Sequence, residues 1–159
     1  MLLRASALCL LVAVPHLPLA QGLQVAFQGF NQDSEQAIEI AADAMAINQE
    51  SGSAELSGNV IIGQGELRLS APRVNVDYSE EGGISRIEAV GGVTIVTPQE
   101  EAEARRAVYV LASDSMLLEG DVLLSQGANA VSADRMNVDL ASGRAVLEGR
   151  VRTVLQPNE

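Results

Sequence analysis

The chain has 159 residues and a formal net charge of −11 at pH 7, and aromatic residues make up only 3% of it. All of its basic residues are arginines, and acids precede the only adjacent pair, Arg105-Arg106. A nucleic-acid-binding protein is expected to carry a basic patch, so this composition argues against nucleic acid as a partner and predicts that an anionic ligand would be held mainly by apolar contact.

The N-terminus has the pattern of an export signal. Arg4 precedes an apolar run of about ten residues from Ala5 to Val14, too short for the roughly 20 residues of a membrane-spanning helix. We expect a cleaved signal peptide over residues 1–22, with cleavage before Leu23 (or, alternatively, after Ala20), and a periplasmic location. An uncleaved N-terminal membrane anchor is the competing interpretation.

Cleavage would remove the only cysteine, Cys9, and the only histidine, His16. The mature chain then has no disulfide, no His- or Cys-based nucleophile and no His/Cys zinc site. The sequence therefore predicts no cofactor, no metal and no enzymatic activity. About 137 residues remain, enough for one ordinary domain.

After cleavage, residues 23–37 are expected to form an N-terminal strand or arm followed by a loop. From Ile38 onward, apolar and polar residues alternate over short runs, which is typical of β-strands. These runs are 38–40, 45–47, 67–69, 74–77, 93–95, 108–110, 136–138 and 151–154. Residues 98–107 (PQEEAEARRA) are good helix formers, and we expect a loop or a single turn there. Residues 156–159 form a short C-terminal tail.

A longer repeat is superimposed on this alternation. Gly58, Gly91, Gly120 and Gly149 are separated by 33, 29 and 29 residues, and a strand pattern beginning near an Ala-Asp pair precedes most of them. Glycine at a fixed place predicts a positive φ or a tight bend. The unit is a strand–turn–strand motif present in about four copies, as in stacked repeat folds. The connections are short, so antiparallel pairing fits better than a parallel β-helix.

Carboxylates are plentiful, so a two-carboxylate carbohydrate-active enzyme remains a formal alternative. However, Asp43, Asp77, Asp134 and Asp139 occupy repeat-equivalent positions. A residue that recurs with the repeat is better explained as a turn or strand-end device, because Asp side chains bond to nearby backbone.

The repeat resembles the OstA-like domain family of lipopolysaccharide transport proteins. The resemblance is carried by residues 37–76 (AIEIAADAMAINQESGSAELSGNVIIGQGELRLSAPRVNV) and by the later copy at 131–155 (VSADRMNVDLASGRAVLEGRVRTVL). It covers roughly Ala37 to Leu155. LptC-like members keep an N-terminal membrane anchor and LptD-like members add a large outer-membrane barrel. We expect neither here, which favours the periplasmic bridge member of the family. The absence of lysine, the short length and residues 98–107 depart from the pattern of enterobacterial members.

The resemblance implies an all-β fold, an OstA-like twisted open β-jellyroll of antiparallel strands over residues 38–155. It also implies a bridge protein that carries lipopolysaccharide from the inner to the outer membrane. The implied partners are lipopolysaccharide, an LptC-like inner-membrane protein at the N-terminal edge, an LptD-like outer-membrane protein at the C-terminal edge, and further copies stacked head to tail.

By motif alignment, the acyl chains would contact an apolar groove, and the two ends of the sheet would contact partners. The groove residues are Ile38, Ile40, Met45, Ile47, Leu56, Val60, Ile62, Leu67, Leu69, Val74, Val76, Ile87, Val93, Ile95, Val108, Val110, Leu117, Val122, Leu124, Met136 and Val138. The partner edges are Ile38 and Ile40 at one end and Val151 and Val154 at the other. A structural β-solenoid with a filled core has the same alternation, so that alternative stays open, as does a membrane-anchored LptC-like component.

Overall fold

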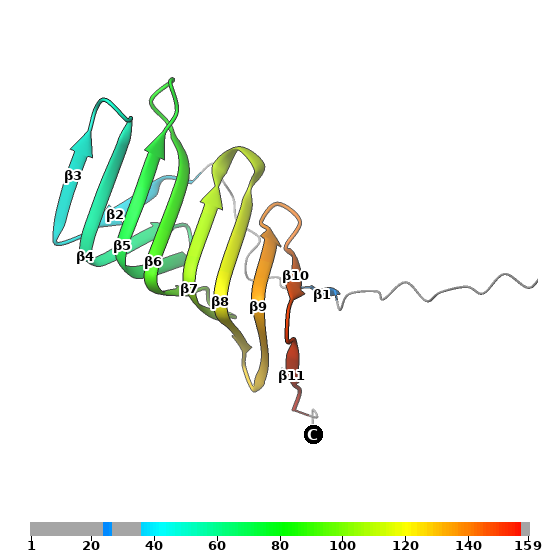
Figure 1. Ribbon diagram of the computed structural model, residues 1–159. Helices are drawn as coiled ribbons and strands as arrows, with labels where there is room; N and C mark the ends of the chain where they lie inside the picture. Colours follow the sequence, from blue (N-terminus) through cyan, green and yellow to red (C-terminus); the bar gives the residue numbers. More distant parts are fainter. Residues whose placement is uncertain (1–23, 27–35, 157–159) are drawn as a thin grey trace, which may run out of the picture.

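The computed structural model describes residues 24–26 and 36–156 (Figure 1). The expected signal peptide, residues 23 and 27–35 of the expected arm, and residues 157–159 of the expected tail lie outside these ranges. The described residues form β-strands and one short 3₁₀ helix, and none of their helices is long and apolar enough to cross a membrane. The strands are β1 (Gln24–Ala26), β2 (Ile38–Ala41), β3 (Ala44–Asn48), β4 (Ser53–Gln64), β5 (Leu67–Tyr78), β6 (Ile84–Val96), β7 (Glu101–Val110), β8 (Ser115–Gln126), β9 (Asn129–Asp139), β10 (Arg144–Glu148) and β11 (Arg152–Val154), and the 3₁₀ helix is η1 (Leu111–Ser113).

All strands belong to one antiparallel sheet. Its order is β1-β10-β9-β8-β7-β6-β5-β4-β2, with β3 also paired to β4 and β11 also paired to β9. β2 and β3 thus form one interrupted edge strand. β10 and β11 form another interrupted strand at the opposite end, where β1 lies outside β10. The two ends are not paired with each other, so the sheet is open. The predicted all-β class and antiparallel pairing are confirmed.

The N-terminal arm does not pair where the chain order suggests. Residues 24–26 pair with β10, at the end of the sheet farthest from β2. The sequence predicts a strand or arm here but leaves its pairing open, because a three-residue strand carries no register information of its own.

A row of bends divides the sheet into two layers. The pairing register shifts on five neighbouring strand pairs: between Ser57 and Val60, Ser70 and Arg73, Val90 and Val93, Glu103 and Arg106, and Glu119 and Val122. Bulges of this kind bend the strands that contain them, and Figure 1 shows β4, β5 and β6 changing direction along their length. Layer A comprises β3, β10 and residues 53–57, 73–78, 84–90, 106–110, 115–119 and 135–139; layer B comprises β2, β11 and residues 60–64, 67–71, 93–96, 101–104, 122–126 and 129–133.

The repeated glycines form these bends. Gly58, Gly91, Gly120 and Gly149 have φ values of 76°, 95°, 82° and 75°, and the residue after each also has a positive φ. Each glycine lies against the side chain at the bend of the preceding strand. A Cβ on Gly120, for example, would lie 3.0 Å from Cβ of Arg105. Only glycine therefore meets both the backbone angle and the close approach.

Side chains close three of the four bends. Asn59 Nδ2 donates to Asp43 Oδ2 at 2.8 Å, and Arg150 Nε donates to Asp134 Oδ1 at 2.9 Å. Arg105 makes the equivalent ion pair with Asp121. In each case the partners are 16 residues apart. The interpretation of Asp43 and Asp134 as structural devices is confirmed at these bends.

At the fourth bend, a proline ring replaces the polar pair. Pro72 Cγ would lie 2.8 Å from a Cβ on Gly91. The residue equivalent to Asn59, Asp121 and Arg150 is Gly92, whose φ is 101°. This bend therefore relies on the rigid ring and on two consecutive glycines instead of a hydrogen bond.

Residues 98–107 correct one expectation. Residues 98–100 lie in the short β6–β7 connection, which is closed by a hydrogen bond from the Thr97 N–H to the Glu100 carbonyl. Residues 101–107 belong to β7, which begins at Glu101, and form neither a loop nor a helical turn. Ala102, Ala104 and Ala107 are buried, whereas Glu101, Glu103 and Arg105 are exposed. Pairing with β6 and β8 on both sides overrides the helix propensity of this segment.

Replacing Gly120 by alanine should destabilise the protein more than the same change at Gly127. Both glycines have a positive φ, which costs alanine about 1–2 kcal/mol. A Cβ at Gly127 meets nothing within 4 Å, but one at Gly120 meets Arg105, which should add roughly 1–3 kcal/mol of overpacking. Urea unfolding followed by circular dichroism measures the difference. Equal losses for the two variants would contradict the close-approach argument.

Candidate lipid-binding interior

The apolar faces of layers A and B meet in one aliphatic interior. Val60, Val74, Leu118, Val122 and Met136 are fully buried within a single hydrophobic cluster that draws on both layers. Alternate residues of each strand point to the inner face, and the register shift at each bend restores this orientation in the second layer. The bends thus fold a sheet with one apolar face into a two-layer structure with an apolar interior.

Most of the predicted groove residues lie in this interior. The members of the buried cluster are Leu56, Val60, Ile62, Leu67, Leu69, Val74, Val76, Ile87, Val93, Ile95, Val122, Leu124, Met136 and Val138. Ile38 and Ile40 are partly buried and pack against it. The sequence prediction missed the alanines at 71, 89, 102, 104, 107 and 145 together with Tyr109, Met116, Leu118 and Leu140.

Three of the predicted groove residues lie instead on the outer face of layer A. They are Val108, Val110 and Leu117. Val108 pairs directly with both Glu88 and Leu117, so these three side chains share one face. The neighbouring Tyr109 pairs with Ile87 and is buried on the other face. Apolar residues occupy consecutive positions here, at 107–110 and 116–118, so alternation alone does not identify the inner face.

At the N-terminal end, the inner face of layer A is exposed. Met45 and Ile47 on β3 pair with the buried Leu56 and Ala54, which places them on the inner face. They are nevertheless 53% and 69% exposed, because no strand of the described residues lies beyond β3. The apolar interior therefore continues to this edge of the sheet.

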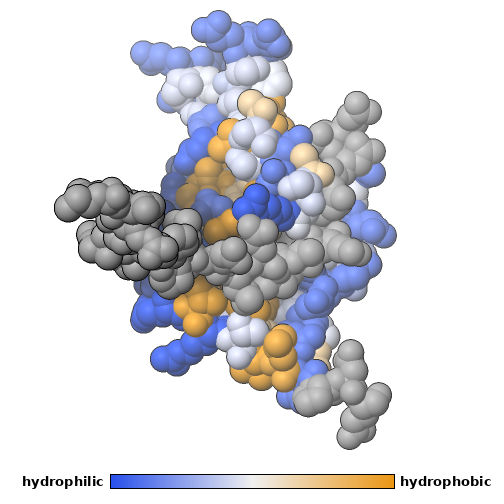
Figure 2. Space-filling model, turned by 90° about the vertical axis from the view of Figure 1, so that its right-hand side faces the viewer, coloured by the Kyte–Doolittle hydropathy of each residue, from blue (hydrophilic) through white to orange (hydrophobic). Residues whose placement is uncertain are grey.

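At the C-terminal end, the predicted edge residues are also exposed but differ in orientation. Val151 precedes β11, and Val154 pairs with Ala130 within it. Val154 lies on the face opposite to that of the buried Val131, so it points away from the interior. Figure 2 views this side and shows hydrophobic atoms in its middle, with hydrophilic atoms along both flanks.

A small cavity lies at the open side of the two layers. Layer B lines it with Ile38, Ile62, Gln64, Leu67 and Leu69. The layer A side lines it with Ile87, Tyr109, Met116 and Leu140. Its volume is about 20 Å³, which is enough for one water-sized group, since roughly 10–15 Å³ is needed. Side chains thus fill the interior, and a longer apolar ligand requires the layers to separate.

Tyr109 is one of two polar residues that line this cavity, the other being Gln64. The Tyr109 hydroxyl lies 3.4 Å from Oδ1 of Asp114, to which it donates a hydrogen bond. Burial and the neighbouring Asp114 carboxylate raise the pKa of Tyr109 above its usual range, so the phenol stays neutral. The ring contributes apolar surface while its hydroxyl is directed towards the loop that holds Asp114.

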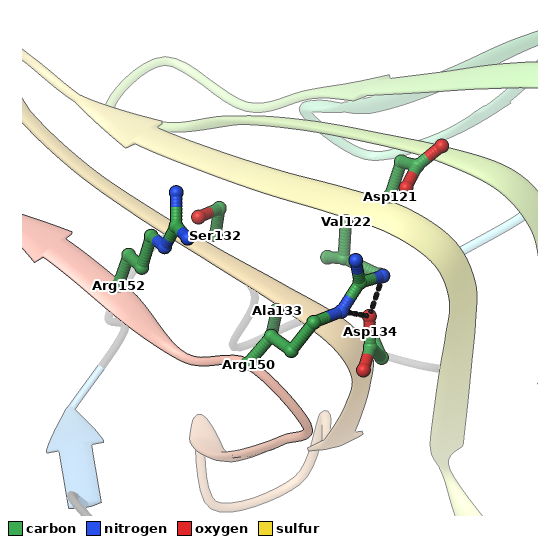
Figure 3. Close-up of a pocket in the computed structure, with 7 residues that line it drawn as sticks. All are labelled: Asp121, Val122, Ser132, Ala133, Asp134, Arg150 and Arg152. Atoms are coloured by element: carbon green, nitrogen blue, oxygen red, sulfur yellow. Dashed lines mark hydrogen bonds and ion pairs between the residues drawn. The ribbon is translucent and has the colours of Figure 1, made fainter.

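A second hollow lies on the outer side of one bend (Figure 3). Its residues include Asp121, Ser132, Asp134, Arg150 and Arg152. Arg150 is bound to Asp134, whereas Arg152 lies apart from this pair (Figure 3). A repeat-equivalent hollow is lined by Asn59, Val60, Ile61, Ser70, Ala71, Pro72, Gly92 and Thr94. Because the hollow recurs with the repeat while its charges do not, it is a product of the bends and not a dedicated site.

The outer face of layer A carries a ladder of ion pairs. Arg106 Nε donates to Glu88 Oε1 at 2.7 Å, and its Nη1 donates to Glu119 Oε2 at 2.5 Å. Arg86 and Arg135 extend the ladder to either side. Among the described residues, no group of three His, Cys, Asp or Glu side chains could hold a metal ion. The charges on this face are paired across strands, as expected for a structural face.

An open, bent antiparallel sheet around an aliphatic interior, with its two ends not paired to each other, defines an OstA-like β-jellyroll domain. A family model described as "LptA/(LptD N-terminal domain) LPS transport protein" matches residues 39–144, and the chain belongs to this family. The family predicted from the repeat is confirmed.

Individual relatives agree with this assignment. Lipopolysaccharide export system protein LptA of Escherichia coli K12 is 26% identical over 140 residues, covering 80% of this chain and 75% of LptA. LptA of Shigella flexneri has the same values. The solved structure of LptH, the LptA-homologous periplasmic component of the lipopolysaccharide transport device of Pseudomonas aeruginosa, aligns with a TM-score of 0.72 at 19% identity, covering 79% of this chain and 99% of LptH. The structural likeness confirms the fold.

The ion-pair ladder should make stability depend on pH. The hydrogen bond from Arg106 lowers the pKa of Glu88 below its usual range. A carboxylate with a depressed pKa stabilises the fold above its unfolded-state pKa, near 4.3, and this contribution is lost as pH falls through the folded-state value. Glu88→Gln should therefore cost about 1 kcal/mol at pH 7, and the cost should shrink on acidification below about pH 4.

Chemical denaturation at pH 7 and at pH 3 measures this effect. Glu80→Gln is the matched control, since Glu80 is exposed in the β5–β6 connection and makes no ion pair with another described residue. A Glu88→Gln cost that is independent of pH would show that the ladder is not an electrostatic contribution.

Proposed function

We propose that this protein is a non-catalytic periplasmic carrier that binds lipopolysaccharide and bridges the inner and outer membranes. In this proposal, a signal peptide of residues 1–22 is cleaved and residues 38–155 form the carrier domain. The acyl chains lie between layers A and B. The observation that supports it best is the aliphatic interior, which both layers line and which continues to the exposed β3 edge.

Apolar burial supplies enough free energy for such binding. Each buried methylene contributes about 0.8 kcal/mol, so several acyl chains offset the cost of separating side chains that now contact one another. The bends hold the layers together along one side only. The opposite side, where Ile38, Leu69 and Met116 line the small cavity, is therefore the side at which the layers open.

The geometry of the two ends supports head-to-tail stacking. The β2–β3 edge runs from layer B to layer A, whereas the β10–β11 edge runs from layer A to layer B. Placing the first edge of one copy beside the second edge of another gives antiparallel pairing in both layers. Sheet, bends and interior then continue from copy to copy, and the exposed side chains of Met45 and Ile47 become covered.

The same edges would receive the two membrane partners. We propose an LptC-like inner-membrane protein at the β2–β3 edge and an LptD-like outer-membrane protein at the β10–β11 edge. Unpaired edge strands favour such strand addition. Free energy for directional movement would come from a machine at the inner membrane, because the chain needs no chemistry of its own to shelter lipid.

One observation favours a second candidate, a structural module that binds no lipid. The interior is filled, and its cavity of about 20 Å³ accepts no acyl chain as it stands. This candidate keeps the stacking edges but predicts that the layers never separate.

Photo-crosslinking in cells separates the two candidates. A photoreactive residue at Ile38 or Leu69 should capture lipopolysaccharide, because both side chains line the cavity. The same residue at Leu123, which is 37% exposed on the outer face of layer B, is the control and should capture none. The carrier proposal fails if no inner-face position yields an adduct while the variant remains folded.

Stacking is tested by placing a charge at the N-terminal edge. Ile47→Lys should weaken self-association by roughly ten-fold or more, because continuing the sheet would bury the new ammonium unpaired. Ile61→Lys is the matched control, since Ile61 is 49% exposed but faces outward from layer B. Sedimentation velocity over a range of concentrations measures the change. Equal weakening by the two lysines would contradict stacking through the inner edge.

A further inference from the structure

The short strand β1 occupies one half of the C-terminal edge. Val25 pairs with Ala145, Gln24 with Val146, and Ala26 with Arg144. Figure 1 shows β1 beside β10, at the end of the sheet away from β2 and β3. Only layer A is covered in this way, because the layer B half of the edge, β11, pairs with β9 alone among the described strands.

β1 also runs in the direction that an incoming strand would take. β10 runs towards the bend at Gly149, and β1 is antiparallel to it, so β1 runs away from the bend. β3 likewise runs away from its bend, from Ala44 beside Ser57 to Asn48 beside Ser53. Against β10, β1 therefore has the position and direction that β3 of a second copy would have in a head-to-tail stack.

We infer that β1 is an intramolecular stand-in for β3 of the next copy, which must leave β10 before a second molecule can add there. This inference rests on the proposed stacking. The partner is a second copy of this chain, and the surface is the outward edge of β10 from Arg144 to Glu148. Exposed strand edges invite unwanted association, and a strand from the same chain prevents it at low concentration.

The lengths of the competing strands make the exchange feasible. β1 covers three residues of β10, whereas β3 has five residues and pairs with β4 along all five. An incoming copy also brings β2 to the uncovered β11, which adds contacts that β1 cannot replace. The intramolecular strand therefore prevails in dilute solution, and the second copy prevails once its concentration is high enough.

The experiment disrupts β1 in the full mature chain. Val25→Pro removes a backbone donor at the centre of β1, and Val25→Thr, which keeps the donor and a β-branched side chain, is the matched control. Hydrogen exchange of the β10 amides in dilute solution reports the β1–β10 pairing. Sedimentation velocity reports self-association.

We expect faster exchange over residues 144–148 and self-association at least about three-fold tighter for Val25→Pro, because masking reduces apparent affinity by the fraction of open edge. Val25→Thr should match the unmodified chain in both measurements. Unchanged exchange in Val25→Pro would overturn the pairing, and faster exchange with equal or weaker self-association would overturn the competition while stacking stands. If no form self-associates at any concentration, the stacking part of the proposed function fails, and the competition fails with it.

Discussion

The structure depends on one backbone constraint, a row of positive-φ bends at the same level across the sheet. Without the bends, the alternating strands would form a long sheet with one apolar face in water, which is a strong signal for aggregation. The bends at Gly58, Gly91, Gly120 and Gly149 bring that face against itself. Because each glycine touches the preceding strand, the bends also hold neighbouring strands at a fixed level. The buried interior and the positions of the edges follow from this alignment.

Much of this arrangement could be predicted from the sequence because the repeat is a backbone requirement. The spacing of the four glycines marks the bends, and the two-residue alternation marks the strands that they divide. The Asp residues at 43 and 134 recur for the same reason, as partners of the residue after each glycine. A strict local requirement produces a periodic sequence pattern. This pattern was sufficient to predict the fold, and two-thirds of the predicted groove residues lie in the buried cluster.

The failures occur where local pattern does not specify the inner face or the partner strand. Around Val108 and Leu117 both strand faces are apolar, so only the pairing with Glu88 reveals which side is outside. The interior alanines of β7 were missed because alanine carries little hydrophobic signal and favours helices. The pairing of β1 with β10 joins distant parts of the chain, and alternation contains no information about such a contact.

A filled interior and a carrier function are compatible for a physical reason. In the proposed carrier, separating the layers would expose apolar side chains and acyl chains would cover the same surface again, so ligand would replace packing at little net loss of burial. An empty rigid groove would instead leave its lining without contacts and destabilise the unliganded protein. Aliphatic side chains suit this exchange, since few polar groups are left unpaired when the layers move. Tyr109 and its hydrogen-bond acceptor Asp114 both lie on the layer A side, so separating the two layers would leave this hydrogen bond intact.

The interior must be able to open, whereas association at the ends of the sheet must be limited. A surface that accepts its own complement forms open filaments. The chain manages its two ends differently. At the β2–β3 end, the apolar side chains of Met45 and Ile47 remain exposed, whereas at the other end β1 already pairs with β10. The strong overall negative charge adds a general repulsion between copies. In the proposed stack, association would then be limited by one exchangeable strand at one end, so growth would respond to local concentration while the interior proposed to hold lipid stayed unchanged.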